Sequence, residues 1–115
     1  MAGDENLIEK ESIVYSIKTS LKYERNLQTA LDFCSQNWDI DTMLNFYLQV
    51  NKEIDKLAFF PYSNPQNRFL NDTNCREIIL RKFPYTITYH IDKNVVKIIN
   101  IVHTSRNPIR RKAKQ

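Results

Sequence analysis

The stretch "CREIILRKFPYTITYHIDKNVVKIINIVH" (residues 75–103) decides the fold, because it reads as three strands in close succession. Residues 85–91 alternate, with Tyr85, Ile87, Tyr89 and Ile91 on one face of the expected strand and two threonines and His90 on the other. Residues 75–82 have apolar side chains on both faces, and the almost wholly apolar residues 95–103 are typical of a strand covered on both faces. Tight connections at 83–84 and 92–94 predict that the three strands are antiparallel neighbours.

The segment before this meander predicts one further strand and two helices. Residues 13–20, "IVYSIKTS", alternate as a strand does, whereas from residue 21 the apolar residues recur at helical spacing until the polar residues before Trp38. A second helix is expected to begin near Asp39 or Asp41, either of which can accept hydrogen bonds from free backbone N–H groups, and to end at Pro61. Its predicted apolar face consists of Ile40, Met43, Leu44, Tyr47, Val50, Ile54, Leu57 and Ala58.

The short connection at Trp38 indicates that the two helices pack antiparallel as a hairpin, with Trp38 plugging its tip. The predicted fold is therefore α+β, in the order β-α-α-β-β-β, with a small antiparallel-rich sheet and the N-terminal helical hairpin on one face. The other face is left for the chain's own tail or for a partner to cover.

Composition excludes several classes of enzyme. Gly3 is the single glycine of the 115 residues, so the glycine-rich loops that bind phosphates and dinucleotides are absent, and there is no GxSxG motif. Cys34 and Cys75 are isolated thiols, which favours core positions over a disulfide or a zinc site. We expect no metal and no cofactor.

Charge divides the chain into two halves. Residues 1–74 hold seven Lys and Arg against eleven Asp and Glu, a net charge of −4, while residues 75–115 hold ten against two, a net charge of +8. A basic half of this kind attracts phosphate backbones or an acidic protein, although a purely solubilising role is the alternative. We expect a flexible acidic leader at 1–12, a domain at 13–108 and a basic tail at 109–115. The opening lacks the features of an export signal, which predicts a cytoplasmic protein.

The second half resembles the RelE/ParE toxin superfamily. The resemblance rests on an Arg-led strand from Arg76, the strand Phe83-Pro84-Tyr85-Thr-Ile-Thr-Tyr89, and a last strand that ends at His103 and is followed by Ser105-Arg106-Asn107-Pro108. The first half matches this superfamily only in its pattern of a strand, a helical hairpin and a proline-marked loop.

This resemblance implies the toxin of a bacterial type II toxin–antitoxin pair and a cognate antitoxin, commonly acidic, that folds onto it. It implies one of two activities: inhibition of DNA gyrase, as in ParE-like members, or ribosome-dependent mRNA cleavage without a metal, as in RelE-like members. A non-toxic interaction module on the same fold is a third alternative. No tyrosine follows Tyr89, although RelE-like nucleases tend to have one near the end of the last strand, and the "SRNP" ending is commoner in ParE-like sequences. Gyrase inhibition is therefore the favoured interpretation.

If the chain is a nuclease, His103 is the expected acid or base, and Arg76, Arg81 and Arg106 are the expected phosphate ligands. Contacts to the target or the antitoxin are predicted for Arg106, Asn107, Pro108, Arg110, Arg111 and Lys112. Structural roles are the alternatives: His103 donating to a backbone carbonyl at the strand end, Arg76 pairing with an acid, and a solvated basic tail. Tyr85 and Tyr89 are expected in the core rather than as stacking platforms.

Overall fold

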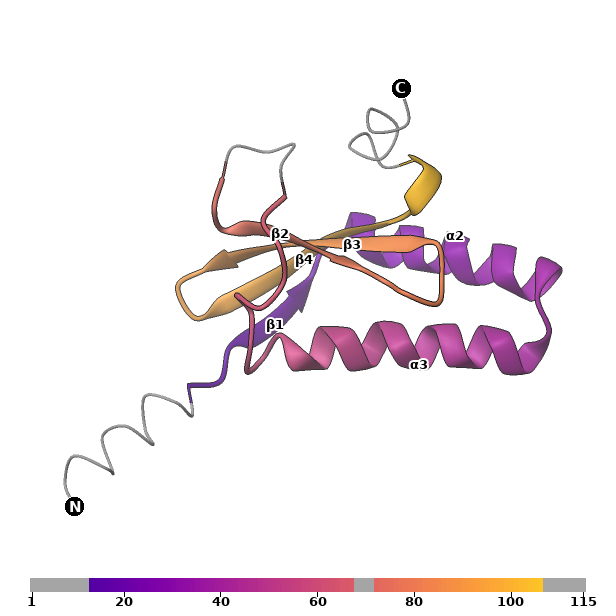
Figure 1. Cartoon of the computed structure of the whole chain (residues 1–115), viewed down its shortest axis with the longest axis horizontal. Coiled ribbons are helices and arrows are strands. Elements are labelled where there is room, and N and C mark those ends of the chain that lie inside the picture. The colour runs from indigo at the N-terminus through magenta and orange to yellow at the C-terminus, as the bar shows by residue number, and fades with distance from the viewer. Residues whose placement is uncertain (1–12, 68–71, 107–115) are drawn as a thin grey trace, which may run out of the picture.

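The computed structural model describes residues 13–67 and 72–106, in which a four-stranded sheet is accompanied by two long helices (Figure 1). The elements are β1 (Ser16–Thr19), α2 (Leu21–Asn37), α3 (Ile40–Lys56), β2 (Cys75–Ile79), β3 (Tyr85–Asp92), β4 (Val95–His103) and the short 3-10 helix η1 (Thr104–Arg106). This order confirms the predicted β-α-α-β-β-β arrangement; β2 and β4 lie within the residues expected for them, and β3 extends one residue beyond, to Asp92.

The sheet has the strand order β1-β4-β3-β2. The strands β2, β3 and β4 pair antiparallel as predicted, whereas β1 lies parallel to β4 with Ser16 beside Val95 and Thr19 beside Ile98. The last strand is therefore an inner strand. The register between β3 and β4 shifts after Thr88, where β4 contains one extra residue.

Two side-chain caps begin the helices. The Ser20 hydroxyl accepts a hydrogen bond from the Tyr23 N–H at 2.9 Å, and the Asp39 carboxylate accepts one from the Thr42 N–H at 2.7 Å. Hydrogen bonding to the side chain of Thr42, and then to its backbone N–H, lowers the pKa of Asp39. With Trp38 as the sole residue between Asn37 and this cap, α3 runs back antiparallel to α2, which confirms the predicted hairpin (Figure 1).

The face of the sheet beneath the helices holds the core. Pairing places Tyr85, Ile87, Tyr89 and Ile91 on this face, and all four are buried. The other buried residues of this core are Tyr23, Ala30, Cys34, Phe46, Val50, Ile54, Leu57, Ile78, Leu80, Phe83, Val96, Ile98 and Ile101. The prediction that Tyr85 and Tyr89 are core residues is confirmed.

Trp38 lies at the tip of the hairpin, as predicted, and packs on other aromatic rings. Its ring centroid is 5.9 Å from that of Phe46 and 5.5 Å from that of Phe83. These contacts join the tip of the hairpin to the connection between β2 and β3.

The predicted apolar face of α3 is confirmed in part, since Val50, Ile54 and Leu57 are buried and Met43 packs against the core. Ile40, Leu44 and Tyr47 are exposed, while Phe46, which the prediction left out, is completely buried with Val50. The helix carries two overlapping apolar stripes, and the stripe that includes Phe46 packs against the sheet. Helix α3 also ends at Lys56, before Pro61, because Leu57 begins a turn there.

The expected cover of the other face of the last strand, by the tail or by a partner, stays a prediction, because residues 107–115 lie outside the described part of the chain. Val96, Ile98 and Ile101 are buried, but Val95 and Val102 are half-buried and Lys97 is exposed.

No helix in the described part of the chain is both long and apolar enough to cross a bilayer.

Candidate functional site

One end of the sheet collects several residues that the sequence singled out. Here β2 and β4 end and β3 begins, because the three strands are antiparallel. His103 closes β4 opposite Tyr85, and Arg81 lies exposed in the connection between β2 and β3. The backbone of Arg106 belongs to η1 directly after β4. The fold therefore brings His103, Arg81 and the start of the "SRNP" segment to the same end.

His103 is held by the turn that follows it. The Ser105 N–H donates to His103 Nδ1 at 3.2 Å, and the Ser105 hydroxyl lies 2.7 Å from the same nitrogen. Since Nδ1 accepts a backbone hydrogen bond, a neutral ring has its proton on Nε2. The alternative in which His103 donates to a backbone carbonyl is thus corrected: its ring accepts from a backbone N–H. The ring also packs edge-on against Tyr85, with centroids 5.3 Å apart.

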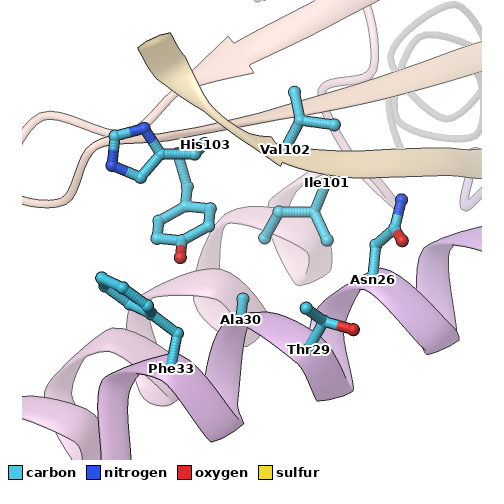
Figure 2. Close-up of a pocket in the computed structure, with 8 residues that line it drawn as sticks. Asn26, Thr29, Ala30, Phe33, Ile101, Val102 and His103 are labelled. Carbon is cyan, nitrogen blue, oxygen red and sulfur yellow. The ribbon is translucent and has the colours of Figure 1, made fainter. Parts of the chain in front are cut away.

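A small cavity of about 180 Å³ lies between α2 and the end of β4. In Figure 2, Asn26, Thr29, Ala30 and Phe33 of α2 lie across from the end of β4, where the Ile101 side chain points toward the helix and that of Val102 points away from it. The lining is mostly apolar, with His103 at one end and Asn26 at the other. A cavity of this size and chemistry suits one apolar or aromatic side chain with a polar edge.

Arg76 lies away from this end of the sheet. It is opposite Tyr89 on β3, and His103 is opposite Tyr85, so the two are separated by four residues, roughly 13 Å along the strands. Arg76 Nη1 donates to the carbonyl oxygens of Tyr62 and Asn64 at 3.1 and 2.7 Å. The Arg76 side chain therefore holds the loop after α3. Its partners are backbone carbonyl oxygens and not the acidic side chain that was the alternative.

The ring of Tyr62 completes this attachment of the loop, because the guanidinium carbon of Arg76 lies 5.1 Å from the ring centroid. The Tyr89 hydroxyl adds a hydrogen bond to the Pro61 carbonyl at 2.6 Å, and burial raises the pKa of Tyr89, although Asn64 and Arg76 oppose that shift. Tyr89 is thus a neutral donor within the core.

Arg81 contributes to a second cavity, of about 540 Å³, between α3 and the β2 edge. Gln49, Glu53 and Lys56 of α3 line its other side. Arg81 and His103 therefore share an end of the sheet but line different cavities.

Five predicted contact residues lie outside the described part of the chain: Asn107, Pro108, Arg110, Arg111 and Lys112. Within residues 13–67 and 72–106, no three His, Cys, Asp or Glu side chains group closely enough to hold a metal ion. Both cysteines are buried, as predicted, and burial raises the pKa of the Cys34 and Cys75 thiols, which makes them poor nucleophiles.

The cavity beside His103 supplies little acid–base chemistry. Of its lining residues, only His103 and Tyr85 can transfer a proton, and Tyr85 is 5% exposed with its ring packed on Phe46. The arrangement resembles a recognition pocket more than a pair of opposed proton-transfer groups.

The sequence reasoning missed the α2 wall of this cavity, formed by Asn26, Thr29 and Phe33. Phe33 is 48% exposed and lies outside the buried stripe of α2, so an aromatic residue at a solvent-facing helical position was the available signal. Asn26 donates to the side chain of Asn100, a contact between distant segments that no local pattern encodes.

Comparison with known proteins identifies a matching family. The model of the family described as the ParE toxin of the type II toxin–antitoxin system parDE matches residues 17–108. No curated protein has a matching sequence.

Solved structures share the fold at low sequence identity. A chain of the chromosomal ParDE system of P. aeruginosa is 15% identical, with a TM-score of 0.66 over 80% of this chain and 98% of that one. A mutant of the E. coli toxin RelE in the free state is 18% identical, with a TM-score of 0.53 over 86% and 92%. A chain of the Mycobacterium tuberculosis complex RelBE2 is 16% identical, with a TM-score of 0.50 over 80% and 93%.

Proposed function

Because this chain belongs to the ParE toxin family of type II toxin–antitoxin systems, we propose that it inhibits DNA gyrase and is neutralised by a cognate acidic antitoxin. The proposal takes the end of the sheet at His103, with the cavity against α2, as the surface that engages the target.

The observation that carries this proposal is that few residues lining the cavity can transfer a proton. RNA cleavage without a metal requires one group to remove the 2′-OH proton, another to protonate the leaving oxygen, and cations at the phosphate. His103 is available, whereas Tyr85 is in the core and Arg76 is bonded to the loop after α3. These positions favour binding of a protein target over cleavage of RNA.

An acidic antitoxin suits the charge of the second half of the chain, which is +8 over residues 75–115. Half-buried Val95 and Val102 on the face of the sheet away from the helices add apolar surface for such a partner.

The direct test incubates the purified chain with DNA gyrase, relaxed plasmid and ATP. We expect loss of supercoiling or trapping of cleaved DNA. Phe33→Ser is expected to weaken inhibition, because it removes the aromatic wall of the cavity, while Phe59→Ser, which replaces an aromatic residue 57% exposed outside the cavity, serves as the matched control. Normal supercoiling at a large excess of toxin would remove this proposal.

A ribosome-dependent nuclease remains the second candidate, because His103 lies at the cavity with a ring oriented by Ser105. Primer extension on translating ribosomes distinguishes the two candidates. Cleavage in the ribosomal A site that disappears in His103→Ala, but persists in the control His90→Ala, would establish the nuclease; intact message would exclude it.

Induction in a bacterial host tests whether the chain is toxic at all. Growth arrest that co-expression of the neighbouring gene reverses is the expected result, and normal growth would favour the non-toxic interaction module.

A further inference from the structure

Two lysines stand side by side on the face of the sheet opposite the helices. In the parallel pairing of β1 with β4, Lys18 is the direct partner of Lys97. The pair before them, Ile17 and Val96, packs into the core beneath the helices, so the lysines point to the other face. Both lysines are exposed.

No carboxylate neutralises this lysine pair within the described residues. The ion pairs there are Lys56 with Glu53 and His90 with Asp72, and His90, the partner of Lys97 on β3, is thus already engaged. Asp92 lies beside Val95 on the neighbouring strand and makes no ion pair with another described residue. Adjacent strands lie about 4.8 Å apart, and like charges directly opposite one another destabilise a sheet.

Protection of an exposed sheet edge explains the position of Lys18 but not that of Lys97. A lysine on an edge strand discourages pairing with other chains, and β1 is an edge strand, which accounts for Lys18. Lys97 belongs to β4, which has a strand on each side, so edge protection gives it no role. The repulsion between two neighbouring lysines on a sheet face is relieved when an anion binds them.

The apolar residues on the face that carries the lysine pair indicate the kind of anion. Val95 lies two residues before Lys97, and Val102 and Ile79 lie farther along this face, on either side of Thr86; all three are half-buried. A nucleic-acid backbone gains little from such apolar surface, whereas an amphipathic acidic peptide contacts both the lysines and the apolar side chains.

We propose that Lys18 and Lys97 bind the carboxylates of an acidic segment of the antitoxin, laid across the uncovered face of the sheet. This inference rests on the proposed function. The repulsion between the lysines in the free toxin is released by the partner, so the pair lowers the stability of the free toxin and raises its affinity for the antitoxin.

The test uses the full chain, its double variant Lys18→Gln/Lys97→Gln, and Lys52→Gln as a matched control, since Lys52 is an exposed lysine of α3. The probe is the purified protein encoded by the neighbouring gene. We expect the double variant to bind it roughly tenfold more weakly at low salt, with the difference shrinking at high salt. We also expect the free double variant to unfold at a higher temperature than the wild type, and Lys52→Gln to change neither property.

Four results would overturn the inference. Unchanged affinity of the double variant would remove the lysine site while leaving the antitoxin in place. Loss of binding to duplex DNA, with antitoxin affinity unchanged, would assign the pair to nucleic acid. If the neighbouring protein does not bind the wild type, the proposed antitoxin relationship itself fails, and this proposal with it. A lower unfolding temperature in the double variant would contradict the stated repulsion. The affinity and the unfolding temperature are also measured for the single variant Lys97→Gln.

Discussion

Replacing Tyr89 by phenylalanine removes one oxygen atom from the centre of the structure, where it ties the loop after α3 to the sheet. Tyr89 is 0% exposed, and its hydroxyl donates to the Pro61 carbonyl at 2.6 Å and accepts from the Asn64 side chain at 3.3 Å. The substitution leaves the carbonyl of buried Pro61 without this donor, and an unsatisfied buried acceptor costs about 1–3 kcal/mol. Since Arg76 holds the same loop, the loop should loosen rather than detach.

Thermal and urea unfolding measure this effect, and the midpoint should fall by roughly 4 °C per kcal/mol. Tyr47→Phe removes the same atom from a side chain that is 41% exposed, and we expect it to change stability by less than about 0.5 kcal/mol. The double variant Tyr89→Phe/Arg76→Met should show coupling of about 0.5 kcal/mol or more, because both residues bind one loop. Equal stability of Tyr89→Phe and Tyr47→Phe, or strict additivity in the double variant, would refute the reasoning.

Burial raises the pKa of Tyr23 to about 12, with Tyr47 and Glu24 adding to the shift. The unfolded state therefore loses its proton first, so stability should fall from about pH 10 to pH 12 in wild type and fall less in Tyr23→Phe, as followed by unfolding in urea. Ser20→Ala removes the cap of α2 and a hydrogen bond to β4, which should cost about 1–2 kcal/mol, whereas Ser35→Ala on the exposed face of α2 should be nearly neutral in the same assay. Phe46→Ala should cost about 3–5 kcal/mol and Leu44→Ala less than about 0.5 kcal/mol; the reverse order would restore the α3 face predicted from the sequence.

The meander of strands was predictable because each strand carries its own alternation. Tyr85, Ile87, Tyr89 and Ile91 share a face in any strand, and the short connection at 92–94 permits little besides antiparallel pairing. The helix caps were local as well, since Asp39 accepts from a backbone N–H three residues ahead of it. For such features the deciding contacts lie within a few residues.

The candidate functional end of the sheet was only partly predictable. His103 and Arg81 reach it because they follow strands that end there, and this much comes from chain order. The separation of Arg76 from His103 follows from chain order too, because Arg76 begins β2, His103 ends β4, and both strands run antiparallel to β3. The α2 wall of the cavity was not predictable in this way, because it depends on how α2 packs against β4.

The sequence by itself determined the order of the elements, the antiparallel meander and the surplus of positive charge in the second half, because alternation, capping and composition act over short distances. Tertiary structure alone decided which stripe of α3 is buried, that Arg76 holds a loop, and that Lys18 lies beside Lys97. These three outcomes depend on contacts between segments far apart in the chain. Several pairings satisfy the local pattern equally well, and packing against the sheet selects one of them.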